Sequence, residues 1–314
     1  MSLLPGPPQV HRLSGPLGCG LTVDVEEWYH NCLVPDFVEP ARRPPLPREL
    51  DRLLPATLEL LAEHRCRATF FTLGEVASEL PGRVREIAAA GHEVASHGLH
   101  HLRVGGMEPR RFRADLERAK KGLEDLLGES VDGYRAPEWS LREVANPRLR
   151  TVAELGFRYD SSLAPCLGSG RRDNPRFAAE LRWEDGRTLI ELPPLTFGGR
   201  WQLPAGGWPG RLAGGEVVAR AARAHRRGGG LPVLVVHPWE LAARPLPGEL
   251  TGLARFIHET GRGRFREEFP ALLDVLPWRS LREAVGERTD VVSLPILRAP
   301  EPESMALPEV TTTA

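Results

Sequence analysis

The sequence predicts an α/β protein whose fold is a distorted, incomplete (β/α)7 barrel. Short β-rich runs alternate with segments of helical periodicity, a pattern typical of parallel strands joined by crossover helices. Seven such runs occur, one fewer than a complete eight-stranded barrel requires. The expected strands are Leu21–Val25, Ala68–Thr72, His92–Ala95, Gly133–Arg135, Phe157–Asp160, Thr188–Leu192 and Val233–His237.

Helical periodicity is clearest over Pro109–Leu127, where apolar residues recur at steps of three and four and form one stripe. A second helix is expected to begin at Pro81, a favoured first helical position, and to end at Gly91. Leu50–Glu63 is a third expected helix. By contrast, Phe197–Gly215 is rich in glycine, and we expect a long loop there.

Composition limits the partners and the compartment. The 314-residue chain has a formal net charge of −1, which argues against binding to nucleic acid. Its four cysteines, Cys19, Cys32, Cys66 and Cys166, show no CxxC spacing, so we expect free thiols rather than a structural zinc site or a disulfide scaffold. We find no signal-peptide pattern and no apolar run of bilayer length, and we therefore expect a cytoplasmic protein without a transmembrane segment.

Unusual polar residues collect at the ends of the expected strands. Asp24-Val25-Glu26-Glu27 ends the first strand, and His97 to His101 follow the third. Arg135, Asp160 and His237 end three further strands. Because the carboxyl ends of barrel strands meet at one mouth, we expect these side chains to line one pocket.

His97 and His101 are four residues apart, so one helical turn would place both imidazoles on the same face. Two imidazoles and a carboxylate suit zinc or another first-row divalent ion. Gly98 excludes a metalloprotease of the HExxH type, which needs a glutamate at that position. We expect the neighbouring His100 to point away from the pocket.

Asp24 and Glu26 are two residues apart, so their side chains share one face of an extended strand. Such a pair can divide its duties, with one carboxylate on the metal and the other free to accept a proton from water. A solvated acidic turn is the alternative interpretation. The spacing alone leaves open whether Glu26 or Glu27 is the metal ligand.

Six segments carry a resemblance to a known family. They are TVDVEEWYH (22–30), ATFFTLG (68–74), GHEVASHGLHHLRV (91–104), GYRAPEWSL (133–141), GFRYDSSLAP (156–165) and VVHPWEL (235–241). In this order they resemble the NodB-type polysaccharide deacetylases of carbohydrate esterase family 4. The resemblance is greatest to the subgroup of bacterial exopolysaccharide loci, which has a C-terminal extension that residues 261–276 match more loosely.

The resemblance assigns a role to individual residues. Asp24 matches the catalytic base, and Arg135 matches the arginine that holds its carboxylate. His97 and His101 match the two metal-binding histidines. His237 matches the catalytic histidine, and Asp160 falls in the block whose acid orients it.

One position departs from the commonest family pattern, which has two adjacent aspartates in the first segment. Val25 stands where the second aspartate, a metal ligand, would be, and valine cannot bind metal. Glu26 is therefore the candidate third ligand, although the substitution puts metal affinity and metal identity in question.

The resemblance also divides the chain. We expect a flexible N-terminus over residues 1–17, a deacetylase barrel over 18–260, a C-terminal extension packed on the barrel over 261–298, and a disordered tail over 299–314.

These observations predict a metal-dependent hydrolase, with zinc as the first candidate ion, that removes N-acetyl groups from an amino-sugar saccharide and releases acetate. The saccharide would be an exopolysaccharide or its precursor. Trp139, Trp239 and Pro137 are the expected substrate contacts, and Trp201 or Trp208 could provide a further sugar-binding face. The sequence specifies neither the sugar and its linkage nor the oligomeric state.

Three other functions remain open. Hydrolases of cyclic amides and ureides, such as allantoinase-like enzymes, belong to the same superfamily. Two histidines and a carboxylate also serve non-haem iron oxygenases, although the paired acids with Arg135 and His237 favour hydrolysis. A non-catalytic sugar-binding relative is the third alternative, and Val25 is its only support.

Overall fold

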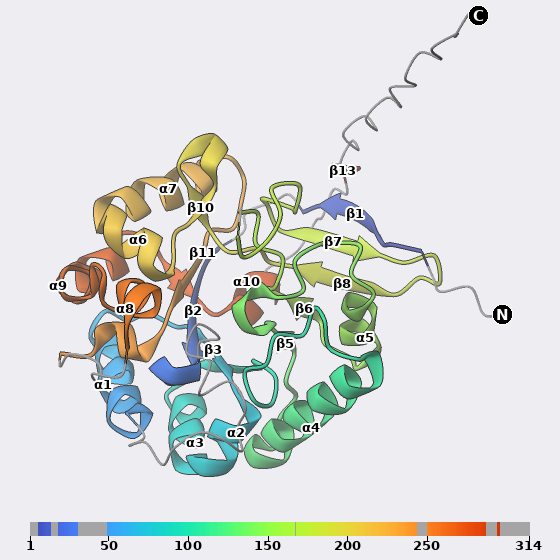
Figure 1. The fold of residues 1–314 in the computed structure, drawn as a ribbon, viewed down its shortest axis with the longest axis horizontal. Coiled ribbons are helices and arrows are strands. Elements are labelled where there is room, and N and C mark those ends of the chain that lie inside the picture. The colour runs from blue at the N-terminus through green and yellow to red at the C-terminus, as the bar shows by residue number, and fades with distance from the viewer. Residues whose placement is uncertain are drawn as a thin grey trace, which may run out of the picture.

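Seven parallel strands form the centre of the computed structural model, which describes residues 6–13, 18–30, 49–166, 168–243, 250–286 and 294–295. Their order in the sheet is β11-β2-β3-β4-β5-β6-β8 (Figure 1). The seven predicted strands are confirmed, with ends shifted by no more than two residues. Their bounds are β2 (Cys19–Val25), β3 (Thr69–Thr72), β4 (Glu93–Ser96), β5 (Gly133–Tyr134), β6 (Tyr159–Asp160), β8 (Thr188–Glu191) and β11 (Val233–Val236).

The barrel is incomplete, as predicted. Within the described part of the chain, β8 and β11 do not pair as strands, so the parallel sheet does not close. One backbone hydrogen bond spans this side, from the Leu195 N–H to the Val233 carbonyl at 2.8 Å. The carboxyl ends of all seven strands still face one mouth, where the polar segments meet.

Antiparallel strands continue the sheet beyond β8. β7 (Ala179–Arg182) pairs with β8, then β1 (Gln9–Arg12) and β13 (Leu294–Pro295) follow. β1 lies within the segment expected to be flexible. In the expected extension, the short β12 (Trp278–Arg279) pairs in parallel with β2. The predicted tail over residues 299–314 lies outside the described residues.

Helices surround the parallel strands (Figure 1). The three predicted helices are confirmed as α1 (Leu50–Glu63), α3 (Pro81–Ala89) and α4 (Pro109–Leu127). In α4 the Glu108 side chain accepts a hydrogen bond from the Arg111 N–H, and Gly128 ends the helix at φ +72°. The other α-helices are α2 (Gly74–Glu79), α5 (Arg148–Glu154), α6 (Gly207–Ala213), α7 (Gly215–Arg227), α8 (Gly252–Glu259), α9 (Arg262–Leu273) and α10 (Leu281–Gly286).

The expectation of a long loop over Phe197–Gly215 is wrong. This stretch contains β10 (Leu203–Pro204), which pairs with β9 (Thr196–Phe197), and the helix α6. Its glycines and Pro209 weaken any helical pattern in the sequence, but tertiary contacts stabilise the helix. In particular, Arg211 of α6 is fully buried.

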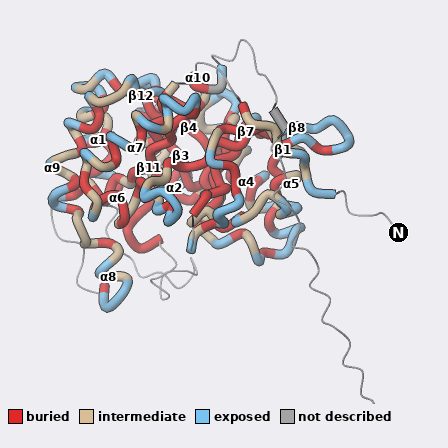
Figure 2. The backbone as a smooth tube through the Cα atoms, turned by 90° about the horizontal axis from the view of Figure 1, so that it is seen from above, coloured by how far each residue is buried: buried red, intermediate tan, exposed pale blue. Residues whose placement is uncertain are grey.

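The central parallel strands are rich in apolar residues because they are buried on both faces. Every residue of β2, β3, β4 and β11 is buried, because one face lines the barrel interior and the other packs under helices (Figure 2). The three cysteines that the structure describes, Cys19, Cys66 and Cys166, are buried free thiols, as predicted, and Cys32 lies outside the described residues.

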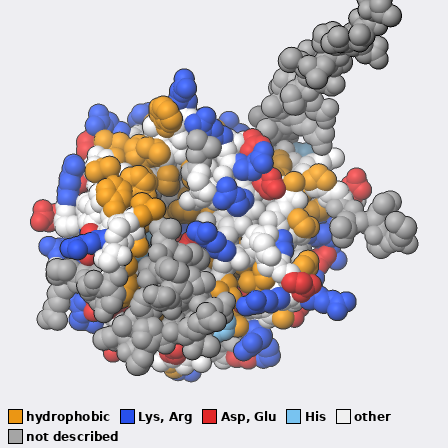
Figure 3. Space-filling model, viewed as in Figure 1, with side chains coloured by type: hydrophobic (Ala, Val, Ile, Leu, Met, Phe, Trp, Pro, Cys, Tyr) orange, Lys and Arg blue, Asp and Glu red, His pale blue; other side chains and the backbone are white. Residues whose placement is uncertain are grey.

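Exposed apolar side chains gather on one side of the molecule. Figure 3 shows them over α6 and its surroundings, where Leu212, Leu253 and Phe256 are among the exposed large hydrophobics. None of the described helices has the length and apolar composition needed to cross a bilayer.

Candidate active site

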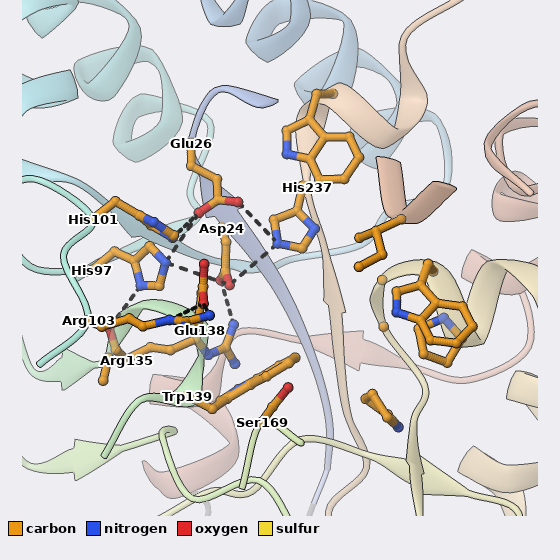
Figure 4. Close-up of a pocket in the computed structure, with 18 of the residues that line it drawn as sticks. Asp24, Glu26, His97, His101, Arg103, Arg135, Glu138, Trp139, Ser169 and His237 are labelled. Carbon is orange, nitrogen blue, oxygen red and sulfur yellow. Dashed lines mark hydrogen bonds and ion pairs between the residues drawn. The ribbon is translucent and has the colours of Figure 1, made fainter. Parts of the chain in front are cut away.

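Three potential metal ligands converge at the carboxyl end of the barrel. The ligand atoms of Glu26, His97 and His101 all lie within 4.8 Å of one another. Glu26 Oε2 is 2.5 Å from His101 Nε2 and 3.6 Å from His97 Nε2. Figure 4 shows the Glu26 carboxylate between this histidine pair and His237. The predicted set is therefore assembled in space.

Local structure fixes both imidazoles. The His97 Nδ1–H donates to the Arg135 carbonyl at 2.8 Å, which leaves Nε2 directed at the carboxylates. His101 lies in the left-handed region at φ +56°, a conformation that costs a non-glycine residue energy and is found mostly at functional sites. Its ring stacks on His30 at 6.0 Å between centroids.

The structure distinguishes the two adjacent glutamates. Glu27 Oε1 accepts a hydrogen bond from the Leu50 N–H at 3.1 Å, so this side chain serves the first turn of α1. Glu26 instead reaches the histidines. His100 Nδ1 lies 2.9 Å from Glu75, which confirms that His100 points away from the cluster. Val25, the departing position, is fully buried in the hydrophobic core.

The donor set fits a divalent ion such as zinc. Burial by itself raises the pKa of Glu26, but His101, followed by His237 and His97, outweighs burial and holds that pKa well below its usual range. The carboxylate is therefore ionised, and the hydrogen bond at Nδ1 of His97 leaves its Nε2 available as a ligand. Two imidazole nitrogens and one carboxylate oxygen are a common set for catalytic zinc, with further positions open for water and substrate.

Asp24 lies beside these three residues and forms an ion pair with the buried Arg135. Arg135 Nη1 donates to Asp24 Oδ1 at 2.6 Å and to the Thr22 hydroxyl at 2.9 Å, while Nη2 donates to the Ser161 hydroxyl at 2.9 Å. The guanidinium also stacks over the Phe71 ring. The predicted pairing of Asp24 with Arg135 is therefore present, and it leaves Asp24 Oδ2 directed into the cleft between the histidines.

His237 lies across the cleft from the metal-ligand cluster. Its Nε2 is 3.5 Å from Glu26 Oε1 and 4.0 Å from Asp24 Oδ2. Its ring stacks on Trp239 with 5.1 Å between centroids. Burial by itself lowers the pKa of His237, but the adjacent Glu240, with Glu26 and Asp24, raises it to about 9.

Asp160 is not where the resemblance placed it. At the end of β6 its carboxylate accepts hydrogen bonds from the Ser162 hydroxyl at 2.7 Å and the Ser162 N–H at 3.0 Å. It faces Glu191, its partner in β8, and burial raises the pKa of both carboxyls. The reason is local, because the hydrogen bonds of the Asp160 carboxylate go to Ser162 and to Glu191 of β8.

The acid that hydrogen-bonds to the His237 Nδ1–H is Glu240, whose role was not predicted from the sequence. Glu240 Oε2 accepts from the His237 Nδ1–H at 2.9 Å and from the His237 backbone N–H at 2.9 Å. Its other oxygen pairs with Arg211. Burial raises the pKa of Glu240, but Arg211 and His237 lower it to about 2. The His-Pro-x-Glu spacing, which matches a capping box, is the signal that could have identified it.

The cleft above these residues has one polar and one apolar wall. On the polar side, Arg103 and Glu138 form an ion pair at 2.5 Å, and Ser169 lies nearby (Figure 4). Trp208, Pro209 and Ile257 contribute to the apolar wall.

Of the predicted substrate contacts, two line the cleft. These are Trp139, which is half-buried, and Trp239, which is buried against His237. Pro137 is buried and does not contribute to the lining. Trp208 is a cleft residue, whereas Trp201 is 60% exposed and lies outside the lining.

Comparison with known families matches two successive parts of the chain. Residues 47–159 match the polysaccharide deacetylase family, and residues 161–286 match a "Domain of unknown function (DUF3473)". The first match contains His97, His101 and Arg135. The second contains His237, Glu240 and Arg211, so the cleft draws on both matched regions, whereas Asp24 and Glu26 precede the first match.

Curated relatives include deacetylases of two substrate classes. The chain is 37% identical over 104 residues to a chitooligosaccharide deacetylase of Sinorhizobium fredii, covering 31% of this chain and 48% of the relative. It is 31% identical over 110 residues to a peptidoglycan deacetylase of Helicobacter pylori, covering 35% and 36%. The matched region thus spans about half or less of these relatives.

Solved structures share the fold. A Mycobacterium smegmatis protein described as a "putative polysaccharide deacetylase" superposes with a TM-score of 0.54 at 23% identity, covering 87% of this chain and 91% of that one. A carbohydrate esterase family 4 pseudoenzyme of Bacillus anthracis gives a TM-score of 0.50 at 14% identity, covering 89% and 70%. The chain thus contains a region, residues 47–159, that matches the polysaccharide deacetylase family, and it shares the fold of these solved structures.

Proposed function

We propose that this protein is a metal-dependent N-deacetylase that hydrolyses the acetamide group of an N-acetylated saccharide and releases acetate. One observation carries the proposal. Glu26, His97 and His101 form a compact ligand set, with Asp24 on its arginine beside them and His237 opposite. A hydrolase of an amide needs a base for water and an acid for the leaving amine, and this arrangement offers both.

Glu26, His97 and His101 would hold the ion, for which we propose zinc. A divalent ion at this position supplies Lewis acidity for the acetamide carbonyl and lowers the pKa of water. The chain's own residues orient that site, since the Arg135 carbonyl fixes His97.

Asp24 would act as the base. Its Oδ1 is held by Arg135, while Oδ2 remains in the cleft and can accept a proton from the attacking water. Arg135 cannot compete as a base, because guanidinium remains protonated. His237 would then donate a proton to the amine nitrogen as the C–N bond breaks, which leaves acetate and a free amino sugar.

The relatives and the cleft support an N-acetylated saccharide as the substrate class. The matched relatives act on chitooligosaccharide or peptidoglycan, which favours an N-acetylated amino sugar over a cyclic amide or ureide. Trp139 and Trp208 offer aromatic faces to sugar rings, and the Arg103–Glu138 pair offers hydrogen bonds to hydroxyls. We propose an exopolysaccharide or its precursor as the natural substrate.

Acetate release from N-acetylglucosamine oligomers tests this function. We expect the purified protein to release acetate, to lose activity after chelation and to regain it when zinc is added. The Asp24→Asn variant should keep its metal, because Asp24 is not in the ligand set, and should lose about 10²–10⁴-fold in kcat.

Two results would contradict the proposal. Ring opening of allantoin without acetate release would identify a different hydrolase. A protein that binds one ion stoichiometrically and binds the oligomers without turnover would be a non-catalytic relative.

A further inference from the structure

We propose that Glu240, anchored by the buried Arg211, positions His237 for proton donation to the leaving amine. This inference rests on the proposed function, since it assigns a partner to the catalytic acid of that reaction. Glu240 touches no reacting atom and acts through His237, so it is a positioning residue.

The hydrogen bonds at His237 support this proposal. The imidazole has two nitrogens, and Nε2 faces the cleft at 3.5 Å from Glu26. Glu240 Oε2 accepts a hydrogen bond from Nδ1 at 2.9 Å, which fixes the ring's rotation and holds a proton on Nδ1. The same oxygen accepts a hydrogen bond from the His237 backbone N–H at 2.9 Å, so Glu240 Oε2 binds both the side chain and the backbone of His237.

Glu240 is itself held in place by the buried Arg211. Arg211 pairs with Glu240 Oε1, and both side chains are only 1% exposed. The rest of the guanidinium is committed to backbone carbonyls near the end of α8, with Nε donating to Thr260 at 3.0 Å and Nη2 donating to Ile257 and His258. A guanidinium held by these carbonyls restrains the carboxylate that it pairs with, so Arg211 limits the movement of Glu240.

Asp160, the other acid considered for orienting His237, makes its hydrogen bonds with other residues. Asp160 is fully buried and bonded to Ser162, and it faces Glu191 across β6 and β8. The acid in position to orient His237 is instead the residue three positions after it. This arrangement also gives α8 a role in the site, because its last carbonyls hold Arg211.

A positioning role predicts dependence on the leaving group. An amine leaves only if it is protonated, whereas the phenolate of 4-nitrophenyl acetate leaves without a proton. We therefore expect Glu240→Gln to lower kcat on N-acetylglucosamine oligomers by about 10²-fold or more, within the range of general acid catalysis. Hydrolysis of 4-nitrophenyl acetate, KM and metal content should change less than about threefold.

A double-mutant cycle with His237→Gln makes the test specific. If Glu240 acts through His237, adding Glu240→Gln to the His237→Gln variant should cause no further loss of kcat. Glu259→Gln is the matched control, because Glu259 pairs with Arg262 in the same region and should leave both activities unchanged. If Glu240→Gln fails to fold, Glu240→Asp retains the charge with a shorter reach and should show the same selective loss on the amide.

The possible failures can be told apart. If the wild-type protein releases no acetate, the proposed function is wrong. If the wild type is active and Glu240→Gln or Glu240→Asp loses both activities equally, or loses neither, the positioning role is wrong even though the function stands.

Discussion

Two fully buried arginines lie on opposite sides of the cleft, and each holds a carboxylate. Arg135 pairs with Asp24 on the side of the metal-ligand cluster, and Arg211 pairs with Glu240 behind His237. Both guanidinium groups are 1% exposed. Their carboxylates differ in duty, because Asp24 faces the cleft directly whereas Glu240 reaches it only through an imidazole.

The two arginines are also anchored differently. Arg135 follows β5 and donates to side chains of its own barrel, the hydroxyls of Thr22 and Ser161. Arg211 belongs to the short helix α6 and donates to backbone carbonyls near the end of α8. We call the side of Asp24 and Arg135 the base side and the side of His237, Glu240 and Arg211 the acid side, after the roles proposed above. The base side is assembled within the barrel strands, while the acid side depends on helices packed against the barrel.

The difference predicts that each side can be disabled separately. Loss of the base side should remove metal binding or water activation, and loss of the acid side should spare the metal.

The largest effect is expected from removing a metal ligand. His101→Ala should abolish stoichiometric metal binding and lower acetate release by about 10³-fold or more, because the ion supplies several kcal/mol of transition-state stabilisation. Elemental analysis and an acetate assay measure both effects.

His100→Ala is the matched control, since His100 is the adjacent residue and bonds to Glu75 instead of Glu26. It should retain the metal. Equal metal loss in both variants would show that the whole segment, and not the His101 imidazole, is responsible.

A smaller effect is expected from removing either arginine. Arg135→Met and Arg211→Met should each lower the free energy of unfolding by about 3–5 kcal/mol, because a buried carboxylate is left without its partner. Urea denaturation measures this loss. Folded Arg211→Met protein should keep its metal. If it bound no metal, the two sides of the cleft would not be separable.

The smallest effect concerns acid stability away from the cleft. Burial lowers the pKa of His92 to about 4, and burial lowers the pKa of His225 to about 4, with nearby arginines contributing to both. The unfolded chain binds these protons near pH 6.5 and the folded chain does not, so stability should fall as the pH drops from 6.5 to 4. We expect on the order of 1–2 kcal/mol from each histidine.

Urea midpoints measured across this range test the contribution, and His92→Asn should flatten the slope. This measurement separates unfolding of the whole protein at acid pH from a loss of activity that arises at either side of the cleft. An unchanged slope in His92→Asn would assign the acid sensitivity to other groups.

The base side was predictable from the sequence because its signals are local. β-rich runs located the strands, and the polar residues that end them, such as Asp24 and Arg135, meet by the geometry of a parallel sheet. The spacing of His97 and His101 predicted that the two imidazoles lie together, although they follow β4 in a loop and not on the helical turn that was expected. The choice between Glu26 and Glu27 needed coordinates, because it depends on which side chain serves α1.

The acid side was predictable only in part. His237 ends a clear strand, but Arg211 lies in a glycine-rich stretch with no helical pattern, and its partners are 29 to 49 residues further along the chain. The periodicity of apolar residues along the sequence does not predict contacts between residues so far apart in the chain. Asp160 was assigned by resemblance, and only the pairing of β6 with β8 shows that it faces Glu191 instead.

Anomalous diffraction at the zinc edge, from crystals of the zinc-loaded protein, would locate the ion itself. We expect one peak within bonding distance of Glu26, His97 and His101, with Asp24 and His237 facing it from either side. A peak at another position, or a zinc-loaded protein with no peak among these three side chains, would contradict it.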